Sequence, residues 1–134
     1  MSQENIEIVR TGYDEFNRTG QPTFEFLDSE VQWHSAADLP DTAVWSGHEG
    51  VAQLFSEWVG SFEDFSAEPN EFLGLGDYVV VSVTLRGRAK DTGVIVELPE
   101  THVWKLRNKK AVEVREYRTK EEALEAVTAG VDAA

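Results

Sequence analysis

Hydrophobic residues recur at helical spacing near the start of the chain and again in its middle. Between residues 3 and 18 the apolar positions would share one face of a helix, which Gly20 can end. These positions are Ile6, Val9, Tyr13 and Phe16. Ser46 and Glu49 have the S-x-x-E spacing of a capping box, and a second apolar stripe follows them. Its members are Val51, Leu54, Phe55, Trp58, Val59 and Phe62. Two amphipathic helices are therefore predicted.

A short helix and a first strand are predicted between these two helices. Pro22 fits the first turn of the short helix, and three apolar residues follow on its inner side. They are Phe24, Phe26 and Leu27. Residues 30–34 alternate, with Val31 and Trp33 on one face, which is typical of a half-buried strand. Residues 35–46 are expected to form a loop.

Strands and a final helix are predicted for the rest of the chain. The segments 70–75, 78–89, 93–107 and 110–118 have the composition of strands and are separated by short turns. Pro99 predicts a bulge or a local sheet edge. A second capping box, Thr119 with Glu122, opens a helix that Gly130 ends, and residues 131–134 are expected to fray.

The order of these elements predicts one α+β domain that spans residues 1–134. Strands clustered after helices favour a mostly antiparallel sheet with three to four helices across one face. A long, bulged sheet curls strongly, and a curled sheet covered by helices encloses a pocket. Functional residues are expected around that pocket.

Composition excludes several classes of function. The 134 residues carry 12 basic and 25 acidic side chains, a net charge of −13 that repels nucleic acids and anionic membranes. No cysteine is present, which excludes disulfides, thiolate metal sites and cysteine nucleophiles. No apolar run has membrane-spanning length, and the acidic start does not resemble a signal peptide. A cytoplasmic location is expected.

Strand alternation places two polar residues on the apolar face of the last two strands. With a three-residue loop at 108–110, Trp104 would stand opposite Val114 and His102 opposite Glu116. The same register pairs Leu106 with Val112. A two-residue loop would shift the pairing by one and place Leu106 opposite Ala111, which wastes the apolar match.

His102 and Glu116 are the main candidates for chemistry. A carboxylate beside an imidazole fixes its tautomer, and such a pair can take up and return a proton near neutral pH. A structural hydrogen bond between two buried polar side chains is the alternative. Tyr13 could supply a hydroxyl donor to the same pocket or be a core aromatic residue.

Further residues are candidates for lining the pocket. Tryptophans offer flat apolar walls and an indole N–H donor, whereas a histidine at the strand end faces the pocket only if the strand twists. The candidates are Trp33, His34, Trp45, Val83, Trp104 and Val114. The three histidines lack the spacing of a metal site, and no Gly-rich phosphate loop precedes a helix. No metal or cofactor is therefore expected.

Three segments carry a resemblance to a known family. Residues 102–117, HVWKLRNKKAVEVREY, residues 120–126, KEEALEA, and residues 45–51, WSGHEGV, resemble the SnoaL-like branch of the nuclear transport factor 2-like superfamily. The resemblance covers nearly the whole chain and implies a cone-shaped fold with a pocket. The superfamily contains isomerases, epoxide hydrolases, dehydratases, polyketide cyclases and non-catalytic binding domains.

The resemblance carries over to individual residues. Tyr13 matches the first-helix tyrosine that donates to the enolate oxygen in ketosteroid isomerases, and His102 falls where those enzymes keep a protonated aspartic acid. Trp33 stands where their proton-abstracting aspartate belongs, so their mechanism is not assigned. Glu116 matches one carboxylate of limonene-epoxide-hydrolase-like members. The arginine and aspartate of those members align with Val83 and Leu85, so that water-activating triad is absent.

Three hypotheses for function follow. The first is a cofactor-independent isomerase, cyclase, dehydratase or hydrolase of an apolar small molecule, with His102 as general base or acid, Glu116 orienting it and Tyr13 donating to a substrate oxygen. The second is a non-catalytic ligand-binding or accessory protein, and the third is a dimerisation module with a collapsed cavity. The outer sheet face carries a basic stripe. It is interpreted either as a solvated face or, because members of the family that this chain resembles commonly form dimers through this side of the sheet, as a homodimer interface. The stripe consists of Arg86, Arg88, Lys105, Arg107 and Arg115.

Overall fold

The computed structural model describes residues 2–35 and 44–130 and has three helices, a short 3-10 helix and six strands there. The expected fraying of residues 131–134, and residues 36–43 of the loop expected at 35–46, lie outside the described residues. In chain order the elements are α1 (Ser2–Thr19), η1 (Phe24–Phe26), β1 (Leu27–His34), β2 (Val44–Ser46), α2 (Gly47–Ser61), β3 (Phe62–Leu75), β4 (Tyr78–Ala89), β5 (Ile95–Arg107), β6 (Lys110–Tyr117) and α3 (Lys120–Thr128).

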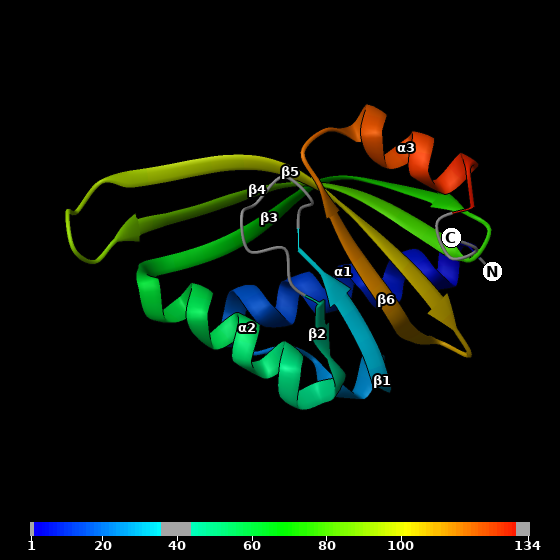
Figure 1. Ribbon diagram of the computed structural model, residues 1–134, viewed down its shortest axis with the longest axis horizontal. Helices are drawn as coiled ribbons and strands as arrows, with labels where there is room; N and C mark the ends of the chain where they lie inside the picture. The colour runs from blue at the N-terminus through cyan, green and yellow to red at the C-terminus, as the bar shows by residue number, and fades with distance from the viewer. Residues whose placement is uncertain (1, 36–43, 131–134) are drawn as a thin grey trace.

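The strands form one curled sheet in the order β2-β1-β6-β5-β4-β3 (Figure 1). All neighbouring pairs are antiparallel except β1 and β6, which run parallel. The α+β fold with a mostly antiparallel sheet is therefore confirmed. The ends of β4 and β5 project beyond the other strands as a long arm in Figure 1. None of the described helices is long and apolar enough to cross a membrane.

The main core lies between the inner face of the sheet and the helices α1 and α2. Alternation along β4 turns Val79, Val81 and Val83 inward, where all three are fully buried. The apolar stripes of the two helices meet this face, as their spacing predicted. The residues that they bury are Val9, Tyr13, Phe16, Val51, Leu54 and Phe55.

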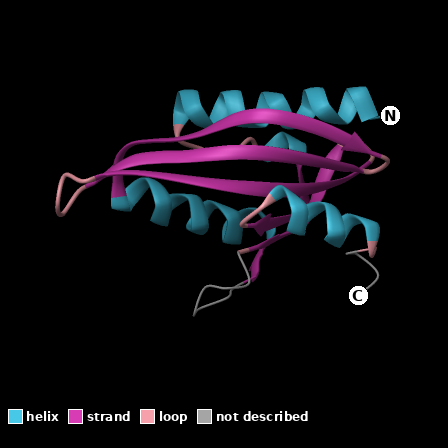
Figure 2. Cartoon of the chain, turned by 90° about the horizontal axis from the view of Figure 1, so that it is seen from above, coloured by secondary structure: helices cyan, strands magenta, loops and turns pink. Residues whose placement is uncertain are grey.

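Helix α3 packs on the other face of the sheet, so the expectation that every helix lies on one face is wrong. Ala123 is fully buried against Val80 and Val103, which alternation turns outward. Figure 2 shows α1 and α3 on opposite sides of the strands. The reason is that Val80 and Val103 leave an apolar patch on this face, which α3 covers. Thr119 caps the start of α3 by accepting from the Glu122 N–H.

Two predicted boundaries around α2 are wrong. Residues 44–46 form a short strand on β1 instead of loop, and Phe62 opens β3 instead of closing the helix. Ser46 precedes α2, as predicted, but its side chain makes no capping hydrogen bond within the described residues. The edge strand β3 begins at Phe62, earlier than the sequence suggested, because Phe62–Leu75 pairs with nearly all of β4.

The turn between β5 and β6 combines the two alternatives considered for it. Arg107 pairs with Lys110, so the loop has two residues, and both Asn108 and Lys109 have positive φ, 53° and 66°. A register shift between Lys105 and Leu106 then restores the expected pairing further from the turn. The predicted pairing of Leu106 with Val112 is consequently wrong, because Leu106 stands opposite Ala111.

Pro99 lies at a local edge of the sheet and not at a bulge. The pairing of β4 with β5 continues without interruption past Thr84 and Pro99. β6 pairs with β5 only from Thr101 onward, so no residue of β6 stands opposite Pro99. The N–H that proline lacks is therefore not needed for pairing with β6.

Candidate functional site

A chain of buried polar side chains crosses the core from β5 to α1. The Trp104 indole Nε1 donates to the Tyr13 hydroxyl at 3.0 Å, and this hydroxyl lies 2.7 Å from Nδ1 of His102. Only 2% of the His102 surface is exposed. Strand alternation places Trp104 and His102 on the same face, and the inner face of α1 brings Tyr13 to both.

The other ring nitrogen of His102 is bound by a residue that the sequence analysis missed. Nε2 lies 3.0 Å from Oε1 of Glu100, whose side chain is 13% exposed. Glu100 precedes His102 by two positions on β5, so alternation turns both inward. That spacing was the available signal.

Glu116 faces the same cluster from the neighbouring strand. It pairs with His102 in the β5–β6 register, as predicted. Ligand atoms of Glu100, His102 and Glu116 all lie within 4.8 Å of one another. The hydrogen bonds of the imidazole go to Tyr13 and Glu100, whereas Oε2 of Glu116 accepts from the Trp33 indole Nε1 at 2.7 Å. Trp33 comes from β1, so the parallel pairing of β1 with β6 positions this contact.

Two cavities adjoin this cluster. The inner cavity has a volume of about 50 Å³ and is bordered by Tyr13, Trp33, His102 and Trp104 among other residues. The outer cavity has a volume of about 370 Å³ and is bordered by both glutamates, Glu100 and Glu116, but not by His102. Its remaining wall is largely apolar, with arginines as well. The wall residues besides the glutamates are Ser35, Trp58, Phe62, Phe65, Leu85, Gly87, Val96, Leu98, Pro99, Arg86 and Arg118.

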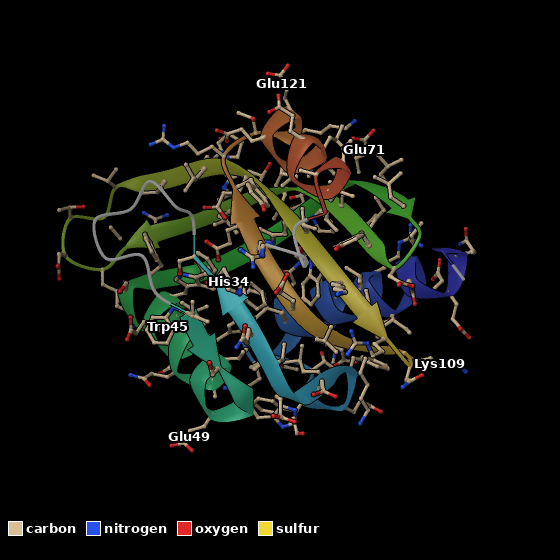
Figure 3. All side chains as sticks on the ribbon, turned by 45° about the vertical axis from the view of Figure 1, so that its right-hand side comes forward. His34, Trp45, Glu49, Glu71, Lys109 and Glu121 are labelled. Carbon is tan, nitrogen blue, oxygen red and sulfur yellow. The ribbon has the colours of Figure 1, made fainter. Side chains whose placement is uncertain are left out.

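The other candidates for lining the pocket border neither cavity directly. Val83 and Val114 are fully buried in the core. Trp45 on β2 donates through its indole Nε1 to Ser35 Oγ at 3.3 Å. His34, at the end of β1, lies 3.7 Å from a Glu113 carboxylate oxygen. Figure 3 labels His34 and Trp45 at this edge of the sheet.

Burial changes the acidity of two side chains in this region. Burial of Tyr13 raises its pKa strongly, Glu116 and Glu100 add to this effect, and the Trp104 hydrogen bond opposes it. Burial of His34 lowers its pKa, as does Arg115, while Glu113 acts in the opposite direction. Tyr13 therefore keeps its proton near neutral pH.

Within the described ranges, Glu100, His102 and Glu116 are the group whose atoms lie close enough together to hold a metal ion. The hydrogen bonds that these side chains make within the chain fit metal binding poorly. Nε2 of His102, the nitrogen near the carboxylates, is hydrogen-bonded to Glu100, and Glu116 accepts from Trp33. Metal ligation would require the His102–Glu100 hydrogen bond to be given up.

Solved structures with the same architecture come from several sources. An NTF2-like protein of unknown function from Burkholderia pseudomallei has 27% sequence identity and a TM-score of 0.71, covering 93% of this chain and 98% of that one. A candidate SnoaL-like polyketide cyclase from Jannaschia sp. CCS1 has 18% sequence identity and a TM-score of 0.74, covering 93% of this chain and 91% of that one. TerC, co-crystallised with polyporic acid, has 22% identity and a TM-score of 0.74, covering 93% and 98%.

The sequence itself matches a family model over most of its length. No match was found among curated proteins. The model of the SnoaL-like domain matches residues 9–114, a range that contains Tyr13, His102 and the first part of β6. The chain therefore belongs to the SnoaL-like domain family.

Proposed function

We propose that the protein is a cofactor-independent enzyme that transfers protons on an apolar small molecule held in the outer cavity. The observation that carries the proposal is the buried contact of His102 with Glu100, beside Glu116, at a wall of the 370 Å³ cavity. A cavity of this volume is in the range of small-molecule sites. Its largely apolar wall favours a mainly hydrophobic ligand.

The chemistry follows from carboxylates held beside an apolar wall. A glutamate oxygen can take a proton from a carbon acid or from an attacking water molecule, and it can return that proton to the product. Isomerisation, cyclisation, dehydration and hydrolysis all need such a step. General acid–base catalysis by one group contributes roughly 10²–10⁴-fold to a rate.

Similar proteins support a small-molecule ligand. TerC was co-crystallised with polyporic acid, and it shares the fold of this chain. We infer from the shared fold only that the cavity of this chain takes a ligand of comparable kind, and the catalytic role rests on the Glu100–His102–Glu116 cluster.

A panel of enones, epoxides and polyketide-like compounds tests the proposal. We expect the wild type to convert at least one compound, and His102→Ala to retain binding but lose about 100-fold or more in kcat. Glu121→Gln on α3 is the matched control, because this residue is exposed and points away from the sheet in Figure 3. Binding without turnover across the panel would contradict the proposal.

Ligand binding without turnover is the second candidate function. The observation that favours it is that the indole donors of Trp33 and Trp104 and the hydroxyl of Tyr13 are already used by protein partners. A network whose donors are already paired can hold the cavity wall without taking part in any reaction. Equal ligand affinity of the wild type and His102→Ala, with no conversion by either, would favour this candidate.

Homodimerisation through the outer sheet face is proposed as well. Within the basic stripe, Arg86 pairs with Glu97 and Arg115 pairs with Glu113. Helix α3 also covers part of this face. On the β4–β5 arm, Ile95 pairs with Arg88 of the stripe and leaves an apolar side chain exposed on this face for a second copy. Light scattering that gives the mass of a monomer at micromolar concentration would contradict this interface.

A further inference from the structure

We propose that Tyr13 and Trp104 hold His102 with its proton on Nε2, so that His102 positions Glu100 and Glu100 is the group that accepts the proton. This inference rests on the proposed function and divides its steps among the residues. Glu100 becomes a catalytic residue, whereas His102 and Tyr13 become positioning residues. The sequence-based hypothesis, with His102 as the base and Tyr13 donating to substrate, assigns these roles differently.

The direction of each hydrogen bond follows from the donors available. An indole nitrogen can only donate, so the Tyr13 oxygen accepts from Trp104. The hydroxyl proton of Tyr13 then points to its other neighbour, Nδ1 of His102. A neutral imidazole whose Nδ1 accepts carries its proton on Nε2. The opposite tautomer would leave the buried hydroxyl proton without an acceptor among the described residues, which is unfavourable.

A protonated Nε2 cannot serve as a base. It donates to Oε1 of Glu100 at 3.0 Å and so fixes this carboxylate in place. Tyr13 does not pass its own proton to Nδ1, because burial and the two nearby glutamates raise its pKa. His102 is therefore a donor toward Glu100 on one side and an acceptor from Tyr13 on the other.

The position of the cavities agrees with these roles. Glu100 and Glu116 border the outer cavity, but His102 borders only the inner one, so a ligand in the outer cavity meets carboxylates first. Glu116 is the more deeply buried of the two and already accepts from Trp33. His102 is faced by Tyr13 from α1, Trp33 from β1, Glu116 from β6 and Glu100 from β5.

The proposed step is redox-neutral. A C–H bond of the substrate, or an O–H bond of attacking water, breaks, and its electron pair stays on that molecule. The proton forms a bond to a carboxylate oxygen of Glu100 and is later returned to the product. No co-reactant is needed for isomerisation or dehydration, and hydrolysis consumes water.

Nitrogen NMR of histidine tests the tautomer directly. In the protein with ¹⁵N-labelled histidines, the His102 signals are assigned by their loss in His102→Gln. We expect a proton on Nε2 and none on Nδ1 at pH 7, and the same pattern in Glu100→Gln, because Tyr13 still occupies Nδ1. A proton on Nδ1, or on both nitrogens, would overturn the inference.

Two substitutions of one residue then separate positioning from proton transfer. The amide N–H of His102→Gln can still donate to Glu100, but the amide cannot act as a base. With a substrate from the panel, we expect His102→Gln to stay within about tenfold of the wild-type kcat. His102→Ala and Glu100→Gln should lose about 100-fold or more, with KM little changed.

Equal losses in His102→Gln and His102→Ala would overturn the positioning role, because they are the result expected for a histidine base. A larger loss in Glu116→Gln than in Glu100→Gln would overturn the assignment of the base. If the wild type converts no compound, the proposed function fails, while the NMR result still decides the tautomer.

Discussion

At the scale of single residues, Tyr13 is the side chain on which the buried network depends. Its hydroxyl is the partner of both the Trp104 N–H and Nδ1 of His102. Tyr13→Phe removes that partner while keeping the ring, and leaving buried polar groups unpaired costs about 1–3 kcal/mol. We expect the free energy of unfolding in urea to fall by that amount.

A matched control is Tyr117→Phe, which removes a hydroxyl from the opposite face, where Tyr117 is only partly buried. Equal losses in Tyr13→Phe and Tyr117→Phe would contradict the importance assigned to the buried network.

His34 gives a prediction for the dependence of stability on pH. Burial and Arg115 lower its pKa in the folded state, so the unfolded chain takes up a proton more readily. Stability from this residue is therefore complete above the ordinary histidine pKa of about 6.5 and is lost as the pH falls below it. We expect His34→Gln to make the decline in unfolding free energy between pH 7 and pH 5 less steep. Identical slopes would show that His34 does not contribute.

At the scale of elements, the β5–β6 turn forces Lys109 into a conformation that suits glycine. Its φ is 66° and that of Asn108 is 53°, and Asn-Gly is the preferred pair for a two-residue hairpin turn of this kind. We expect Lys109→Gly to raise the unfolding free energy by roughly 0.5–1 kcal/mol. Its surface ion pair with Glu4 is exposed and adds little. Lower stability of Lys109→Gly would contradict this account of the turn.

The elements themselves could largely be predicted from apolar spacing, whereas their relative placement could not. The apolar stripe that ends at Phe16 was sufficient to predict α1, and the stripe that begins at Val51 was sufficient to predict α2. The register that joins His102 to Glu116 was correct, although the bulge near Leu106 that produces it was not foreseen. Helix α3 could not be assigned to a face, because alternation along a strand buried on both sides does not say which face a later helix covers.

The candidate site could be predicted only in part for a similar reason. Strand parity identified His102, Trp104 and Glu116, but contacts between distant elements decide hydrogen-bond partners. The Trp33–Glu116 bond depends on the parallel pairing of β1 with β6, and no local pattern indicates which strands will be neighbours.

At the scale of the whole molecule, the account requires ligands to occupy the outer cavity. Leu98 borders that cavity and is 46% exposed, so a tryptophan there can reach into the space without disturbing the core. We expect Leu98→Trp to weaken ligand binding at least about tenfold, measured by calorimetry, with little change in Tm. Leu75→Trp, also at an exposed leucine, is the control. Equal affinity of both variants would place the ligand elsewhere.

The most direct test of the central claim is isotope incorporation by the whole protein. Panel compounds that bind are incubated in water enriched in deuterium and oxygen-18, and mass spectrometry measures the label gained by each compound. The account predicts labelling by the wild type at least about 100-fold faster than by Glu100→Gln, at equal affinity. Tight binding by the wild type with labelling no faster than in protein-free solution would contradict it.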